Sequence, residues 1–100
     1  MIFITQLIYI IEGQEKDFDE FENIAIPIIA KYNGRLLLRV RPTENSYVKY
    51  NIDKPDEIHL ITFETQQDFE CFRQDEERKK ALQLKDKSIM SSILIQGTIL

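Results

Sequence analysis

The stretch IFITQLIYII, residues 2–11, decides the fold, and its Ile, Phe, Thr and Tyr residues favour a pleated strand. Alternate side chains of a strand point to opposite faces of the sheet. Apolar residues fill both faces here: Ile2, Ile4, Ile8 and Ile10 on one, and Phe3, Leu7, Tyr9 and Ile11 on the other. A sheet with one wet face would alternate apolar and polar residues. The pattern therefore predicts a strand that is covered on both faces.

The rest of the chain predicts two helices and three more strands. Apolar residues recur at intervals of three and four over Glu15–Tyr32, which predicts an amphipathic helix that ends at Asn33-Gly34. A second helix is expected from about Gln66 to Lys85, after a capping sequence that begins at Thr65. Its middle, RQDEERKK, is interpreted as a solvated charged face. The other strands are expected at residues 35–41, 57–64 and 89–99.

The order of these elements is strand, helix, strand, strand, helix, strand. Right-handed crossovers place both helices on one face of an antiparallel sheet. The predicted fold is therefore α+β, a ferredoxin-like βαββαβ arrangement whose four-stranded antiparallel sheet has the order 4-1-3-2. We expect residues 1–100 to form a single domain. A second copy of the sheet would cover the bare face, which predicts a homodimer with the architecture of a dimeric α+β barrel.

Composition excludes several classes of protein. The net charge of −4 argues against a nucleic-acid partner, because polyanion binding needs clustered Lys and Arg. The apolar start of the chain is shorter than the roughly 20 residues that a membrane span needs, so no membrane partner is expected. Cys71 is the single cysteine and no Cys/His cluster accompanies it, so we expect no metal site, no cofactor and a cytoplasmic location.

The stretch RLLLRVRP, residues 35–42, places Arg35, Arg39 and Arg41 on one parity of a strand. Three interpretations are open, one of which is that the arginines form salt bridges at an interface. The second strand is at the edge of the predicted sheet, where charged side chains discourage aggregation. Alternatively, Arg39 turns into a cavity between the sheet and the helices and holds a carboxylate or an enolate through paired hydrogen bonds.

Three further residues are candidates for a ligand site. His59 is the only histidine and could accept a proton near neutral pH, although the sequence places no carboxylate to form a relay with it. Tyr9 and Tyr32 carry rings with polar tips, which suit an amphipathic pocket. Each of the three also fits as an ordinary core or interface residue.

The stretch IAIPIIAKYNGRLLLRVRP, residues 24–42, resembles the core motif of the small DUF1330-type proteins of the dimeric α+β barrel superfamily. The matching features are a proline inside the first helix, Ala-Lys-Tyr before a glycine turn, and an apolar strand with an arginine, here Arg39. The stretch IHLITFETQQDFECF, residues 58–72, resembles the third strand and second-helix start of that family. The resemblance implies a homodimer. The superfamily includes cofactor-free monooxygenases, isomerases and haem enzymes, so the fold alone selects no activity.

Together these features predict a small cytoplasmic homodimer that binds a small acidic or aromatic ligand between sheet and helices, through Arg39, His59, Tyr9 and Tyr32. The alternative is a cofactor-free monooxygenase or isomerase acting on a small planar metabolite, with His59 as the base and Arg39 as the anion holder. The chain has no tryptophan, which counts against a monooxygenase. A purely structural interaction module is the third hypothesis.

Overall fold

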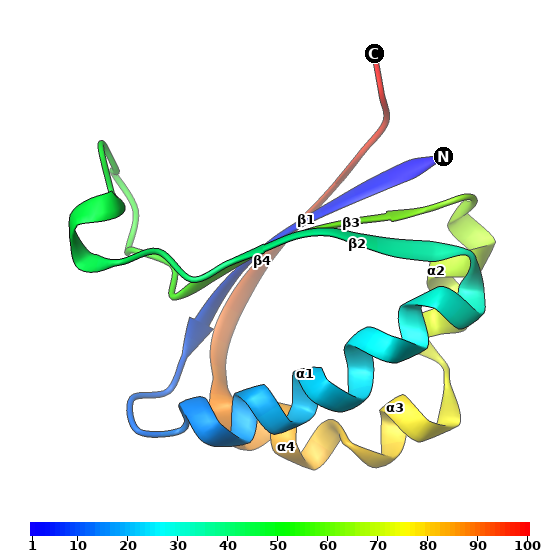
Figure 1. Ribbon diagram of the computed structural model, residues 1–100, viewed down its shortest axis with the longest axis horizontal. Helices are drawn as coiled ribbons and strands as arrows, with labels where there is room; N and C mark the ends of the chain where they lie inside the picture. Colours follow the sequence, from blue (N-terminus) through cyan, green and yellow to red (C-terminus); the bar gives the residue numbers. More distant parts are fainter.

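The computed structural model describes residues 1–100 as a four-stranded sheet with all of its helices on one face (Figure 1). The strands are β1 (Ile2–Ile10), β2 (Gly34–Val40), β3 (Glu57–Phe63) and β4 (Ile89–Gly97). The helices are α1 (Glu15–Ile29), α2 (Gln66–Arg73), α3 (Glu76–Lys80) and α4 (Leu82–Ser88), with 3-10 turns η1 (Ala30–Tyr32) and η2 (Glu44–Ser46). The sheet is antiparallel in the order β2-β3-β1-β4, which is the predicted order read backwards. The predicted α+β, ferredoxin-like fold is confirmed.

The core lies between the inner face of the sheet and α1. The four isoleucines of β1 that were predicted to share a face are at most 9% exposed. The side chains that α1 buries follow helical spacing: Phe18, Phe21, Glu22, Ala25, Ile28 and Ile29. Pro27 lies within α1 on its exposed side, and the helix continues through it. Burial of each large apolar side chain stabilises the fold by roughly 1.5–3 kcal/mol.

The connection from η1 into β2 depends on two small residues. Asn33 adopts the left-handed conformation, with φ 57°, and ends η1 as the sequence predicts. Gly34 then passes so close to the core that a Cβ atom there would lie 2.6 Å from Phe63 Cε1 and 2.7 Å from Ile29 Cγ2. Glycine is required at this position because β2 and α1 approach each other too closely for any side chain.

The prediction of one helix from Gln66 to Lys85 is wrong, because the chain forms three short helices there. Asp75 begins α3 by accepting a hydrogen bond from the backbone N–H of Arg78, at 2.9 Å. Its other carboxylate oxygen accepts from the Tyr32 hydroxyl at 2.6 Å. These bonds stabilise a break between α2 and α3 and turn α3 back along α1.

The prediction that the three arginines share a face of β2 is also wrong. The register between β2 and β3 shifts between Leu36 and Leu38, which is a β-bulge. Arg35 therefore pairs with Thr62 on the bare face of the sheet, whereas Arg39 pairs with His59 on the helix face. The inserted residue therefore places Arg35 on the opposite face of β2 from Arg39, although simple alternation would place both on one face.

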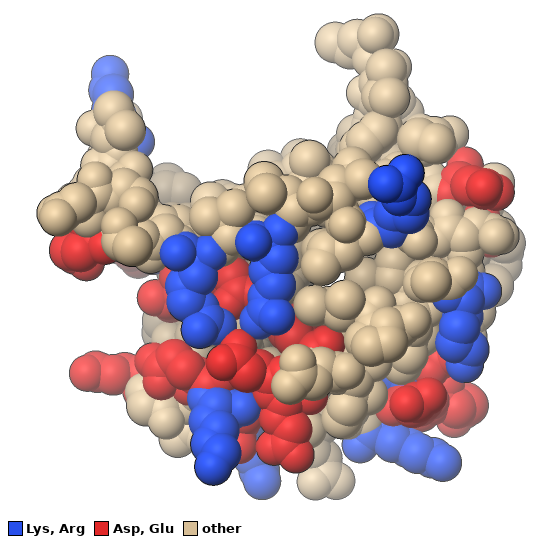
Figure 2. Space-filling view, in the orientation of Figure 1, with Lys and Arg blue, Asp and Glu red and all other residues tan.

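The face of the sheet away from the helices, here called the open face, is rich in apolar side chains. Strand pairing places the following residues there: Phe3, Leu7, Leu38, Val40, Ile58, Leu60, Ile93 and Ile95. Leu38, Ile93 and Ile95 are 48%, 40% and 53% exposed. Charged side chains gather instead on the helix side of the sheet (Figure 2). No helix of the chain has the length and apolar character needed to cross a bilayer.

Candidate functional site

A cavity lies between the sheet and the helices, where the sequence predicted one. It consists of two adjoining voids of about 50 Å³ and about 280 Å³, here called together the inner cavity. Five residues line both voids: Gln6, Ile61, Phe72, Arg78 and Lys85. Ser92 and Leu94 of the exposed edge strand β4 line the larger void. The smaller void continues inward to His59 and Glu22.

Arg78 is the principal charged group of the inner cavity. Its guanidinium carbon lies 5.0 Å from the centre of the Phe72 ring and 6.0 Å from that of Phe21, so two aromatic faces hold it. One guanidinium N–H, from Nη1, donates to the backbone carbonyl of Arg73 at 3.3 Å. Nε is buried and has no hydrogen-bond partner in the protein. Buried donors are normally paired, so this N–H lacks an acceptor that the chain itself does not supply.

Lys85 adds a second positive charge from α4. Its side chain is half-buried, and this burial lowers its pKa, as does the positive charge of Arg78 beside it. A nearby anion would oppose both effects, because it favours the charged form of an amine. Arg78 and Lys85 line both voids, Arg73 adds a third cation to the larger one, and apolar rings wall the rest of that void. These rings belong to Phe63, Phe69 and Phe72.

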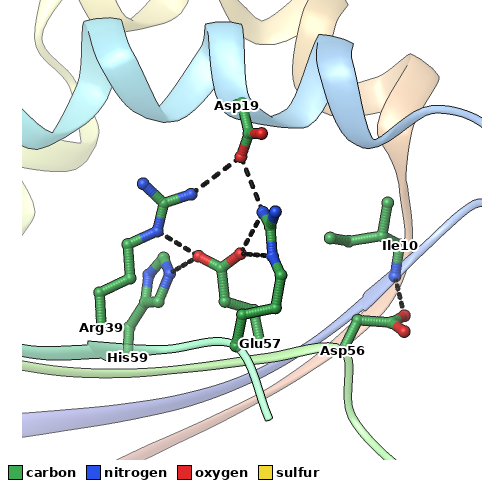
Figure 3. A network of polar contacts seen from close by, with 7 residues as sticks. Ile10, Asp19, Arg39, Asp56, Glu57 and His59 are labelled. Atoms are coloured by element: carbon green, nitrogen blue, oxygen red, sulfur yellow. Dashed lines mark hydrogen bonds and ion pairs between the residues drawn. The ribbon is translucent and has the colours of Figure 1, made fainter. Parts of the chain in front are cut away.

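His59 lies on β3 and lines the smaller void, so this predicted ligand-site residue is part of the cavity wall. It is 1% exposed, and its Nε2 lies 2.6 Å from Glu57 Oε1 (Figure 3). A carboxylate partner for this histidine was missed from the sequence. The signal was present, because Glu57 precedes His59 by two residues and so shares its face of the strand.

Arg39 does not enter the inner cavity. It donates to Glu57 through Nε and to Asp19 of α1 through Nη2 at 3.1 Å (Figure 3). Arg41 binds the same two carboxylates, at 2.7 and 2.8 Å. These residues line a separate polar recess of about 420 Å³ together with Asn23. The hypothesis that Arg39 holds a ligand in the cavity with His59 therefore has no geometric support, since ion pairs within the chain occupy its guanidinium.

Glu57 is the centre of this ionic network. Although burial alone would raise its pKa, hydrogen bonds from His59, Arg39 and Arg41 outweigh that effect and lower the pKa to about 2. Its side chain is only 1% exposed. Glu57 is therefore ionised across the physiological range and joins β2, β3 and α1.

The two tyrosines also lie away from the inner cavity. The Tyr9 hydroxyl donates to the backbone carbonyl of Asp53 at 2.7 Å and ties β1 to the loop before β3. The Tyr32 hydroxyl donates to Asp75 at the start of α3. Hydrogen bonds within the protein thus occupy both predicted ligand-binding tyrosines.

Glu22 is a cavity residue that the sequence reasoning missed. It is 7% exposed on the inner face of α1 and lines the smaller void. Desolvation raises its pKa, and the charges of His59 and Arg39 only partly offset that effect. Its spacing from Phe18 and Ala25 was the available signal, because it places a carboxylate on the apolar stripe of the helix. No three His, Cys, Asp or Glu side chains gather in a metal-binding group.

No protein-family model and no curated protein sequence matches this chain. Solved structures share its fold at low sequence identity. A Rhodopseudomonas palustris protein, RPA0582, is 11% identical with a TM-score of 0.81, covering 99% of this chain and 82% of that one. A "putative antibiotic biosynthesis monooxygenase" from Nitrosomonas europaea is 10% identical with a TM-score of 0.75, covering 100% and 99%.

A third solved structure is that of a dimeric protein with a ferredoxin-like fold from Bacteroides fragilis, 11% identical with a TM-score of 0.70, covering 98% of this chain and 95% of that one. At this level of identity such likenesses establish the fold alone. Membership of the DUF1330-type family stays a prediction.

Proposed function

We propose that the chain binds a small organic acid with an aromatic or planar body in the inner cavity. The single observation that carries this proposal is the buried, unpartnered Nε–H of Arg78 at the cavity wall. A carboxylate is the acceptor that a guanidinium binds best, since charge-assisted hydrogen bonds are roughly twice as strong as neutral ones. The binding role predicted for Arg39 is thereby assigned to Arg78.

The rest of the cavity supports the same ligand class. Lys85 provides a second positive charge near the guanidinium, while Phe63 and Phe69 line the larger void. A ligand that places its carboxylate at the cations and its ring against the aromatic walls satisfies both ends. Ligand sites of this kind combine apolar walls with a few convergent polar groups.

The proposal includes a homodimer formed through the open face of the sheet. Leu38, Ile93 and Ile95 expose apolar area that the helices leave uncovered. A second copy offers a matching apolar surface, because a two-fold interface brings the same patch of both subunits together. The dimeric Bacteroides fragilis protein has the same sheet architecture and adds support.

The family and the location belong to the proposal as well. The motif at residues 24–42 supports a DUF1330-type protein of one domain over residues 1–100. The lone thiol of Cys71 fits a reducing cytoplasm.

The alternative is an enzyme that acts on a small planar metabolite without a cofactor. The pairing of His59 with Glu57 at the cavity wall favours this alternative, because a carboxylate that orients a histidine is typical of proton-transfer sites. An isomerase would use proton transfer alone. A cofactor-free monooxygenase is the other activity, which the name of the Nitrosomonas europaea protein suggests.

Calorimetric titration with matched acids and amides tests the binding proposal. The probes are phenylacetate and phenylpyruvate, with phenylacetamide as the neutral counterpart. We expect the acids to bind and the amide to bind at least tenfold more weakly, and Arg78→Gln to remove that preference. Lys79→Gln, an exposed neighbour on α3, is the control and should bind like the wild type. Equal affinity of acid and amide, or unchanged affinity in Arg78→Gln, would contradict the proposal.

A further inference from the structure

We propose that Glu22 is a catalytic residue that moves a proton on the acid bound in the inner cavity. The reaction class is proton transfer next to a carbonyl, such as the keto–enol interconversion of an aromatic 2-oxo acid. This inference rests on the proposed function, because it needs the ligand in the same cavity. It assigns the base to Glu22 rather than to His59.

Glu22 differs from the other buried carboxylates in having no partner. Glu57 accepts hydrogen bonds from one histidine and two arginines, and Asp75 accepts from Tyr32 and from the backbone of Arg78. The Glu22 side chain makes no hydrogen bond and no ion pair, yet it is 7% exposed and lines the smaller void. A carboxylate that lines a void and has no partner in the chain is a candidate for a group that acts on a ligand.

The charges around Glu22 come from every element that packs against it. Glu57 and His59 approach from β3, Arg39 from β2, Arg78 from α3 and Lys85 from α4. Burial raises the pKa of Glu22 above its usual value, and this change makes the carboxylate a stronger base. Arg78 and Lys85 line the same void, and their charges would stabilise negative charge on the substrate.

The proposed step balances without an added reagent. The Glu22 carboxylate accepts a proton from the carbon next to the keto group. The electron pair of that C–H bond forms a carbon–carbon double bond, and the keto π electrons move to oxygen. The positive charges of Arg78 and Lys85 stabilise the resulting enolate oxygen, and the Glu22 carboxylic acid returns its proton to that oxygen or to carbon. The atoms of the substrate are conserved, and nothing is oxidised or reduced.

His59 is the competing base through its other ring nitrogen, Nδ1, because Nε2 is engaged with Glu57. Its Nε2 lies 2.6 Å from a carboxylate whose pKa of about 2 keeps it ionised. An ionised carboxylate only accepts hydrogen bonds, so Nε2 carries a proton and donates it to Glu57. Nδ1 of this tautomer accepts protons, so loss of exchange in Glu22→Gln is the result that separates Glu22 from His59 as the base.

The experiment follows deuterium exchange at C3 of phenylpyruvate in D₂O by proton NMR, with calorimetric affinity measured on the same samples. We expect wild-type protein to accelerate exchange over buffer, and Glu22→Gln to lower that acceleration by about 100-fold or more while its affinity stays within about threefold. Glu20→Gln, an exposed carboxylate on the same helix, should exchange like the wild type. The pH profile of exchange should lose its acidic inflection in Glu22→Gln.

Each outcome distinguishes the two proposals. If phenylpyruvate binds but wild type fails to accelerate exchange, or Glu22→Gln retains it, the catalytic role is overturned and the binding role stands. If wild type binds phenylacetate but not phenylpyruvate, the catalytic role is overturned and the binding role stands, and if it binds neither acid, both are overturned. If Glu22→Gln does not fold, Glu22→Asp replaces it, and an exchange rate equal to the wild type would then overturn the catalytic role.

Discussion

His59 Nε2 lies 2.6 Å from Glu57 Oε1, so the only histidine of the chain is held by a carboxylate two residues earlier on the same strand. Both side chains are 1% exposed and point toward α1 (Figure 3). The same carboxylate binds Arg39 and Arg41. One side chain of β3 therefore organises the polar groups between the sheet and the first helix, next to the inner cavity.

Glu57→Gln should destabilise the protein, and the effect should fade in acid. The pKa of Glu57 is about 2 in the folded protein against an ordinary value of 4.5. Its ionised form therefore stabilises the fold fully above pH 4.5, by roughly 3 kcal/mol, and that stabilisation is lost as the pH falls toward 2. Urea unfolding from pH 2 to 7 checks this. The control is Glu64→Gln, at an exposed residue just after β3. If the free energies of unfolding of the wild type and Glu57→Gln differ by the same amount at every pH, the prediction is wrong.

Glu22→Gln should change the pH dependence of stability in the opposite direction. Burial raises the pKa of Glu22 in the folded protein above its ordinary value of 4.5. Above pH 4.5 the unfolded chain therefore loses the Glu22 proton, while the folded protein keeps it up to the raised pKa. The free energy of unfolding of the wild type should fall relative to Glu22→Gln as the pH rises from 4.5 through the raised pKa, by about 1.4 kcal/mol per unit of pKa difference. Parallel stability curves for the two proteins between pH 4 and 8 would show that Glu22 is not desolvated.

Gly34→Ala should destabilise the protein by about 1–3 kcal/mol, because the added Cβ atom would overlap Phe63 and Ile29 at 2.6 and 2.7 Å. Gly97→Ala in β4 is the matched control, since a Cβ atom there meets nothing within 4 Å. Chemical denaturation of both variants checks the prediction. Equal stability of the two would mean that β2 and α1 can separate at no cost.

Ile93→Glu should dissociate the proposed homodimer. Ile93 pairs with Leu7 on the open face, and it is 40% exposed in a single chain. A carboxylate there would be buried against the second copy, so we expect the dissociation constant to rise about a hundredfold or more. Sedimentation velocity measures this. Gln96→Glu adds the same charge to the same strand, but its pairing with Ile4 places it on the helix side, so its dimer should persist. A wild-type protein that is monomeric at micromolar concentration would rule out the homodimer.

The sequence predicted the elements of the fold well because their signals are local. Periodicity and the Asn33-Gly34 pair locate the first helix, and its continuation through Pro27 needed only apolar anchors on both sides of the proline. The two-sided apolar pattern of β1 also corresponds to the structure, where one face is core and the other is open. Strand order then followed from handedness rules.

The site was harder to predict because it depends on tertiary events. A one-residue bulge at Leu37 moved Arg39 away from the face of Arg35, and no residue type in RLLLRVRP marks that bulge. Arg78 was interpreted as part of a solvated charged helix. Its burial between Phe21 and Phe72 depends on the break at Asp75, which helical periodicity does not reveal. Charged residues are normally expected at the surface, so the sequence does not reveal that these lie in an apolar cavity, and only the packed fold does.

In the proposed complex, the unpartnered Nε–H of Arg78 donates a hydrogen bond to the carboxylate of the bound acid. The most direct measurement is the ¹⁵Nε–¹H NMR signal of Arg78, assigned with Arg78→Lys, during titration with phenylpyruvate. We expect a downfield shift and slower solvent exchange of that proton as the site fills, since a charge-assisted hydrogen bond forms. If the Arg78 signal stays unchanged while other cavity residues report saturation, Arg78 Nε–H does not bind the carboxylate.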